Sequence, residues 1–310
     1  MGTEKDIEAL DKKRVLWLPF CASCGEDYVD ALSQRFKAYK RFVIAHDMVV
    51  DNKILDSLCA RIPQVLKEYT KGNVLKACGI FTRLMDSTLR KEIQDNIELW
   101  INEISNKNCY YRLRPGKHTD PNSLKHIPFN QLYLTKSDRF SSQGSVCLYL
   151  SYTEKACRSE ITDEITTIAS FKLKDNVSIK VFDMSAYKLN KSNTFSDKED
   201  NHKKSLNTLW PLIAACNSIA YYCPLNNKEC KSITRNFKIE YVIPQMLASY
   251  IKENLFAQDN KLKGIRYYTV RNEMLDPSST DWMDLVLFTD YKPDKKYDSF
   301  LDESFDVTLK

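Results

Sequence analysis

RFSSQGSVCLYLSYTEKACRSE, the stretch from Arg139 to Glu160, predicts a turn, a buried strand and a helix in direct succession. Gly144 marks the turn, and the run Val146–Leu150 that follows is short, apolar and rich in β-forming residues, as in a buried strand. Ser151 or Thr153 then supplies an N-cap for a helix. A strand followed at once by a helix indicates a fold that mixes both kinds of element.

The same stretch carries three residues that suit a nucleotide with a glycosidic bond to be broken. The planar cation of Arg139 can grip a pyrophosphate through two parallel hydrogen bonds, and the ring of Tyr149 can stack on a flat base. Glu160 lies at helical spacing from Ala156 and Cys157, on the face expected to meet the sheet. A carboxylate there can stabilise positive charge on a ribose as its base departs. From these three residues alone, a surface arginine, a core tyrosine and a solvated glutamate remain the alternative.

Several ordered blocks of the chain resemble the RES domain family, which is named for its Arg, Glu and Ser. They occur in the order of the family across the region of roughly Cys109 to Phe288. The blocks are YYRLRPG (Tyr110 to Gly116), HIPF (His126 to Phe129), DRFSSQGSVCLYLS (Asp138 to Ser151), CRSE (Cys157 to Glu160), EYVIPQMLASYIKE (Glu240 to Glu253) and LKGIRYYT (Leu262 to Thr269).

The resemblance implies an enzyme that consumes NAD as its substrate, on an α+β fold whose mixed β-sheet core is related to the ADP-ribosyltransferase toxins. Members of the family are toxins of bacterial toxin-antitoxin pairs that degrade NAD by hydrolysis or phosphorolysis, and some relatives transfer ADP-ribose to a protein. We therefore expect NAD as a ligand. An antitoxin or regulatory partner protein, a homo-oligomer and a catalytically silent nucleotide-binding protein stay open.

The resemblance also implies roles for individual residues. Arg112 matches the early arginine of the family, with Arg114 as the alternative, and both are expected to bind NAD. Arg139, Tyr149 and Glu160 match the later arginine, tyrosine and glutamate, which are expected to be catalytic.

Thr269 stands where the family has its serine, and is expected to position the ribose end of NAD. Threonine keeps the hydroxyl and adds a methyl group, so it can substitute only where its stiffer rotamer points the same way. We therefore expect this departure to bear on activity and not on the binding fold.

Composition limits the other classes of function. The chain has 310 residues, 43% of them hydrophobic, and can bury a substantial core. Its 46 basic residues are interleaved with 41 acidic ones, which is typical of a mixed solvated surface and not of a nucleic-acid-binding face. No apolar run is long enough for a membrane span, and the charged start MGTEKDIEALDKKR is unlike a secretory signal, so we expect a cytoplasmic protein. With only seven glycines and no glycine-rich phosphate loop, NAD binding in the Rossmann manner is excluded.

Cys21 and Cys24 form a C-x-x-C motif, and two thiolates at this spacing can bind one Zn²⁺. A structural zinc site needs four ligands, and a second pair at similar spacing is absent, leaving Cys59, Cys78 and His46 as distant candidates. We therefore expect reduced cysteines and no metal site.

The hydrophobic pattern of the sequence changes near residue 105, from helical spacing to short runs of β-forming residues. Residues 1–105 predict an N-terminal helical region, and residues 106–310 predict the RES-like catalytic domain. Expected helices include Thr88–Ile104, Asn207–Cys223 and Tyr241–Asn254, expected strands include Asn108–Arg114 and Gln131–Thr135, and Lys188–Lys204 is expected to be a loop.

Overall fold

The computed structural model describes residues 15–16, 18–23, 26–159, 165–185, 197–222, 237–255, 262–269 and 282–310. The chain divides into two compact units, and each unit is built from two separate stretches of sequence. The first comprises residues 1–97 and 192–246, and the second comprises residues 98–191 and 247–310. The fold is α+β, with several helices and a mixed eight-stranded sheet, as the sequence predicts.

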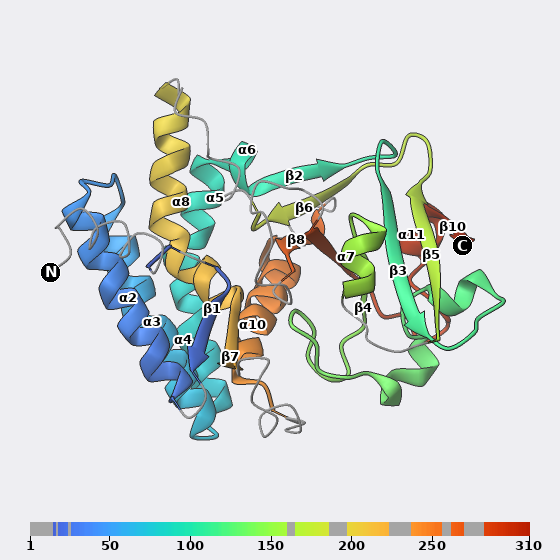
Figure 1. Ribbon diagram of the computed structural model, residues 1–310, viewed down its shortest axis with the longest axis horizontal. Helices are drawn as coiled ribbons and strands as arrows, with labels where there is room; N and C mark the ends of the chain where they lie inside the picture. The colour runs from blue at the N-terminus through green and yellow to red at the C-terminus, as the bar shows by residue number, and fades with distance from the viewer. Residues whose placement is uncertain are drawn as a thin grey trace, which may run out of the picture. The chain divides into compact units, whose positions relative to one another are not determined.

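Helices build most of the first unit, and those that follow one another in the chain pack side by side (Figure 1). Asp51 caps one of them by accepting hydrogen bonds from the backbone N–H groups of Lys53 and Ile54, at 3.0 and 3.1 Å. Another buries Tyr39, whose ring stacks on Trp210 with 4.1 Å between centroids. The helices are α2 (Tyr28–Ala45), α3 (Asn52–Thr70), α4 (Val74–Ser87), α5 (Leu89–Asp95), α8 (Asp197–Cys216) and the short η4 (Ile239–Tyr241).

Two strands in the first unit form a small parallel sheet of their own. They are β1 (Phe20–Ser23) and β7 (Ser218–Tyr222), and their register pairs Phe20 with Ser218 and Ser23 with Tyr222. The hydroxyl of Tyr28 at the start of α2 lies 2.5 Å from the Ser218 hydroxyl, which ties this sheet to the helices.

The large sheet belongs to the second unit and has the strand order β10-β5-β3-β4-β9-β8-β6-β2. Only β6 and β8 run parallel, and every other neighbouring pair in this sheet is antiparallel. The strands are β2 (Ile101–Ile104), β3 (Cys109–Pro115), β4 (Cys147–Ser151), β5 (Thr166–Leu173), β6 (Ile179–Asp183), β8 (Leu262–Tyr268), β9 (Met283–Phe288) and β10 (Phe305–Leu309).

Short helices complete the second unit, and one long helix is shared by both units. The short ones are α6 (Ile97–Trp100), which begins in the first unit, η1 (Pro121–Leu124), η2 (Phe129–Leu134), α7 (Glu154–Ser159) and α11 (Ser299–Ser304). The shared helix is α10 (Val242–Tyr250), which continues as the π-helical turn η5 (Ile251–Leu255). In the described ranges, no helix combines the length and the apolar character that a membrane crossing requires.

Apolar residues on one face of the large sheet form its main core. Leu148 and Leu150 of β4 alternate with outward residues and meet Leu285 and Leu287 of the neighbouring β9. Because side chains alternate along a strand, the intervening Tyr149 points to the other face of β4.

The large sheet is weakly joined at one place, between β3 and β4. These strands share a single registered pair, Tyr111 with Ser151, whereas every other neighbouring pair of this sheet shares at least four. The three strands β10, β5 and β3 are therefore joined to the five strands from β4 to β2 by one registered pair, although apolar side chains from both sets pack in the same core. Figure 1 shows β3 and β4 in the second unit.

Two predicted elements are wrong. The segment Gln131–Thr135 is expected to be a strand, but its residues up to Leu134 lie in the 3₁₀ helix η2. Tyr133 and Leu134 are exposed instead of being buried in a sheet. The predicted loop Lys188–Lys204 contains the start of α8 at Asp197, while residues 186–196 lie outside the described part of the chain.

Two predicted helices run on into strands. The helix expected over Asn207–Cys223 ends at Cys216, where the Asn217 N–H donates to the Ile213 carbonyl at 2.9 Å, and β7 follows. The helix expected over Thr88–Ile104 divides into α5 and α6, and its last four residues form β2. In both cases tertiary pairing with a distant strand overrides local helix propensity.

Candidate functional site

Arg112 lies one residue beyond the point where β3 and β4 separate. Its Nη1 atom is buried and has no hydrogen-bond partner among the residues that the structure describes. Burial, and to a smaller extent the neighbouring Arg114, lower the pKa of Arg112 to about 9, although Asp138 acts in the opposite direction. A buried guanidinium N–H group without a hydrogen-bond partner is costly, so this position suits an anionic ligand.

Arg114, the alternative for the same role, is already engaged by the protein. Its Nη2 donates to the backbone carbonyl of Lys125 at 2.9 Å. Burial lowers the pKa of Arg114, with a smaller opposing effect of Tyr297. This contact gives Arg114 a structural role in holding the segment after β3, so Arg112 is the better candidate for binding a phosphate.

Arg139 lies in a tight turn that precedes β4. The N–H of Asp138 donates to the carbonyl of Ser141 at 2.9 Å, and the N–H of Ser141 donates back to the carbonyl of Asp138 at 3.3 Å. The Arg139 side chain is buried, with 9% of its surface exposed. The turn therefore fixes the backbone that carries this arginine.

Tyr149 holds that turn through its hydroxyl oxygen. It accepts a hydrogen bond from the Phe140 N–H at 3.2 Å and lies 2.9 Å from the Ser141 hydroxyl. Burial raises the pKa of Tyr149 well above its ordinary value, with further increases from Cys147 and Asp138, so the phenol is neutral. The polar end of Tyr149 thus positions the Arg139 turn, which the sequence does not reveal.

Replacing Tyr149 with Phe is expected to lower the free energy of unfolding by about 1 kcal/mol, because the turn loses a hydrogen-bond acceptor for the Phe140 N–H. Urea denaturation of the purified protein measures this. The control is Tyr133→Phe. The Tyr133 side chain is exposed to water, so the loss of its hydroxyl should leave the free energy of unfolding unchanged. A Tyr149→Phe protein as stable as the wild type contradicts the anchoring role.

The predicted helix after β4 is confirmed as α7, and Thr153 is its cap. The Thr153 hydroxyl accepts a hydrogen bond from the Ala156 N–H at 3.1 Å. Ala156 and Cys157 are buried, as expected for the face that meets the sheet. Glu160 follows the last residue of α7 in the sequence and lies outside the described residues.

Thr269 directly follows β8. Its N–H donates to the Trp282 carbonyl at 3.0 Å, and only 3% of its surface is exposed. The preceding Tyr268 packs in a cluster with Trp282, Met283 and Ala156, so the end of β8 lies beside α7.

Tyr267 connects the same strand to the Arg139 turn. Its ring packs on the ring of Phe140, with 4.6 Å between the centroids. The structure therefore gathers the turn of Arg139, the hydroxyl of Tyr149 and the strand that leads to Thr269. Arg112 lies within electrostatic range of Asp138 and Tyr149, while Arg114 is bound elsewhere.

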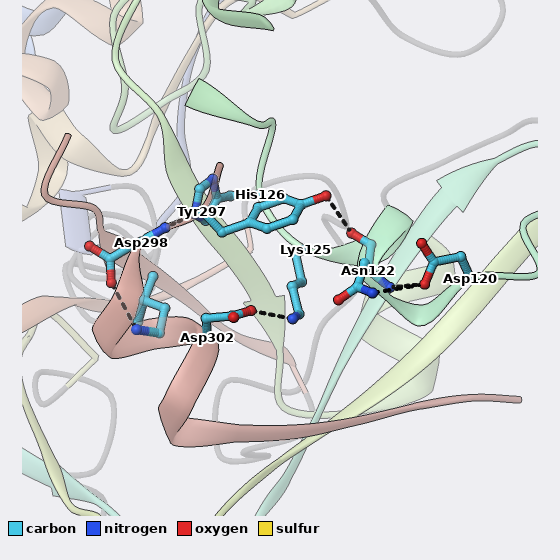
Figure 2. A network of polar contacts seen from close by, with 8 residues as sticks. Asp120, Asn122, Lys125, His126, Tyr297, Asp298 and Asp302 are labelled. Carbon is cyan, nitrogen blue, oxygen red and sulfur yellow. Dashed lines mark hydrogen bonds and ion pairs between the residues drawn. The ribbon is translucent and has the colours of Figure 1, made fainter. Parts of the chain in front are cut away.

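A second polar network, which holds the segment contacted by Arg114, centres on His126 (Figure 2). His126 Nε2 accepts the N–H of Asp298 at 2.9 Å, and Nδ1 lies 2.7 Å from the Ile127 carbonyl, so the proton resides on Nδ1 of a neutral ring. Asp298 caps α11 by accepting the Leu301 N–H at 2.8 Å. Figure 2 also shows the ion pair between Lys125 and Asp302.

His126 is expected to make stability depend on pH. Burial lowers the pKa of His126, and Arg112 acts in the same direction, opposed by the Ile127 carbonyl, Asp298 and Asp302. A histidine held neutral binds its proton more readily when unfolded, so its contribution is present above about pH 6.5 and is lost as the pH falls below that value.

Urea denaturation at pH 7.5 and pH 5 tests this expectation in the wild type and in His126→Gln. The wild type should lose more stability between the two pH values than the variant does. His118→Gln is the control, since that imidazole lies near the surface with its Nε2 2.9 Å from the Pro115 carbonyl. Equal losses in the wild type and His126→Gln contradict the role of His126.

The cysteine motif falls partly outside the structure. Cys21 is on β1, and Cys24 is not among the described residues. Within the described residues, no group of three or more His, Cys, Asp or Glu side chains is arranged to hold a metal ion.

Comparison with known proteins gives one similar protein. The chain is 25% identical over 268 residues to a Bacillus subtilis (strain 168) protein named "Putative toxin YopC". The match covers 82% of this chain and 58% of that protein, so the chain spans less than two thirds of its relative. No family model matches the chain. No solved structure matches it either.

Proposed function

We propose that the protein cleaves NAD between nicotinamide and ribose, and that it acts as a bacterial toxin by depleting NAD. The observation that carries the proposal is the buried guanidinium of Arg112 at the separation of β3 and β4, near the anchored turn of Arg139. The similarity to a protein named a toxin supports the biological role. The resemblance to the RES family supports the chemistry.

Each arginine has a part in binding in this proposal. Arg112 and Arg139 hold the pyrophosphate, whose negative charge removes the cost of burying the Arg112 cation. The hydroxyl of Tyr149 keeps the Arg139 turn in place, and its ring packs on the nicotinamide or its ribose. Thr269 positions the ribose end.

Glu160 stabilises the positive charge that develops on the ribose as the bond to nicotinamide breaks. The bonding electron pair leaves with nicotinamide, which becomes neutral. Water then captures the ribosyl carbon and loses a proton to give ADP-ribose, or inorganic phosphate captures it to give ADP-ribose 1″-phosphate. Either nucleophile approaches the ribosyl carbon from its open face.

Induced expression in a bacterium tests the toxin role. We expect the wild-type protein to stop growth and to lower the cellular NAD concentration before growth stops. Glu160→Gln, produced to the same level, should do neither. Growth arrest with an unchanged NAD concentration contradicts NAD depletion as the mechanism.

A further inference from the structure

A cavity of about 340 Å³ lies between two helices of the first unit, to which none of the residues assigned to NAD belongs. The helices are α3 and α4, which pack side by side (Figure 1). Only Lys71, Gly72 and Asn73 separate them in the sequence, so they form a hairpin of antiparallel helices. Small-molecule sites usually have volumes of about 300 to 1,000 Å³, so this cavity is large enough for a small ligand.

One face of each helix lines the cavity, because the lining residues recur at helical spacing. They are Ser57, Arg61, Ile80, Arg83, Leu84 and Ser87. Ile80 and Leu84 are buried and make part of the wall apolar. Ser87 donates to the Leu84 carbonyl at 3.1 Å, so its hydroxyl hydrogen is already used within α4. The lining therefore combines two cations with an apolar surface, and no acidic side chain is among these described residues.

Arg83 brings a positive charge to the cavity that no neighbouring carboxylate balances. An added Cβ at Gly79 would lie 3.6 Å from Arg83 Nη1, so the guanidinium lies over Gly79, one turn back along α4. Asp86, three residues further along α4, pairs with Arg90 at 3.3 Å. Within the described ranges of the chain, Arg83 has no ion-pair partner.

Arg61 is held in place by a neutral group. Its Nη1 donates to Gln64 Oε1 at 2.8 Å, which orients the guanidinium and leaves its charge uncompensated. The acid near it on α3, Asp56, pairs with Lys40 at 2.6 Å. Ser57, one turn before Arg61, adds a hydroxyl that can donate a hydrogen bond to a ligand in the cavity.

We propose that this cavity binds an organic phosphate of about the size of a mononucleotide. A guanidinium presents two parallel N–H groups to a phosphate, and here Arg61 and Arg83 present theirs from two different helices. The negative charge of the phosphate balances the two cations. Ile80 and Leu84 contact the uncharged part of the ligand. The inference does not rest on NAD cleavage, because the two sites share no residue.

Isothermal titration with AMP as the probe tests the proposal. The full-length Arg112→Met protein is used, so that AMP does not enter the proposed NAD site. We expect about one AMP per chain, and binding about 10- to 100-fold weaker when Arg61→Met or Arg83→Met is added, because each removes a charge-assisted hydrogen-bond donor. Arg41→Met is the matched control, since that arginine is exposed on α2 and does not line the cavity. It should leave the affinity for AMP unchanged.

Adenosine and inorganic phosphate separate the two parts of the ligand. We expect both to bind at least 10-fold more weakly than AMP, because adenosine lacks the charge and phosphate does not reach Ile80 and Leu84. No AMP binding at millimolar concentration overturns the proposal, and this result does not depend on the folding of the arginine variants. Equal AMP affinity in the proteins with and without Arg61→Met and Arg83→Met, or adenosine or phosphate binding as tightly as AMP, also overturns it.

Discussion

Glu160→Gln is expected to slow NAD cleavage by about 10²- to 10³-fold, because the variant keeps the shape of the side chain and removes the charge that opposes the positive ribose. The rate is measured as nicotinamide released from NAD by the purified protein. Circular dichroism and urea denaturation should show an unchanged fold.

Glu154→Gln provides the control for this substitution. Glu154 is six residues earlier, at the start of α7, where it pairs with Arg158 and Lys310 near the surface. Its loss should leave NAD cleavage unchanged. Full activity in Glu160→Gln, or an equal loss in both variants, contradicts the assignment of Glu160.

Arg112→Met is expected to abolish detectable NAD binding and, at the same time, to raise the free energy of unfolding by about 1 to 2 kcal/mol. The gain in stability follows because the substitution removes a buried cation whose Nη1 has no hydrogen-bond partner among the described residues. Isothermal titration with NAD and urea denaturation measure the two effects. Loss of binding together with a gain in stability would show that Arg112 serves ligand binding and lowers the stability of the folded protein.

Arg114→Met is the matched control, two residues along the same strand. It should destabilise the protein, because the Lys125 carbonyl loses the hydrogen bond from Arg114 Nη2. Opposite stability changes in the two variants support the distinct roles of these arginines. If Arg112→Met is as destabilised as Arg114→Met, the Arg112 cation is already satisfied and is not available for a phosphate.

Local patterns in the sequence predict those elements whose partners are close in the chain. The strand β4 and the helix α7 follow each other directly, and Thr153 can be named as a candidate cap because its acceptor geometry depends only on residues three positions away. The α+β class follows from the same patterns. The prediction of a strand over Gln131–Thr135 is wrong, because this segment has the composition of a strand but does not pair with another strand in the structure.

Pairing between distant segments is the part of the fold that the sequence does not reveal. The residues Ser218–Tyr222 look like a continuation of α8, but they form a strand because β1, from the other end of the chain, lies beside them. The separation of β3 from β4 also depends on tertiary packing, since both strands have ordinary strand patterns.

The candidate site shows the same division. The motif resemblance selects Arg112, Arg139 and Tyr149, and the structure brings Arg139 and Tyr149 together through one turn. The motif resemblance favours Arg112 over Arg114, but the physical difference between them lies in a backbone carbonyl of another segment, which the sequence does not reveal. Glu160 lies outside the described residues, so its role stays a prediction.

The most direct test of the central claim is to incubate the purified protein with NAD, with and without inorganic phosphate, and to identify the products by chromatography and mass. We predict free nicotinamide in both cases or with phosphate alone, accompanied by ADP-ribose for hydrolysis or ADP-ribose 1″-phosphate for phosphorolysis. Label from NAD found on a protein would instead identify an ADP-ribosyltransferase. Intact NAD under both conditions would contradict the account.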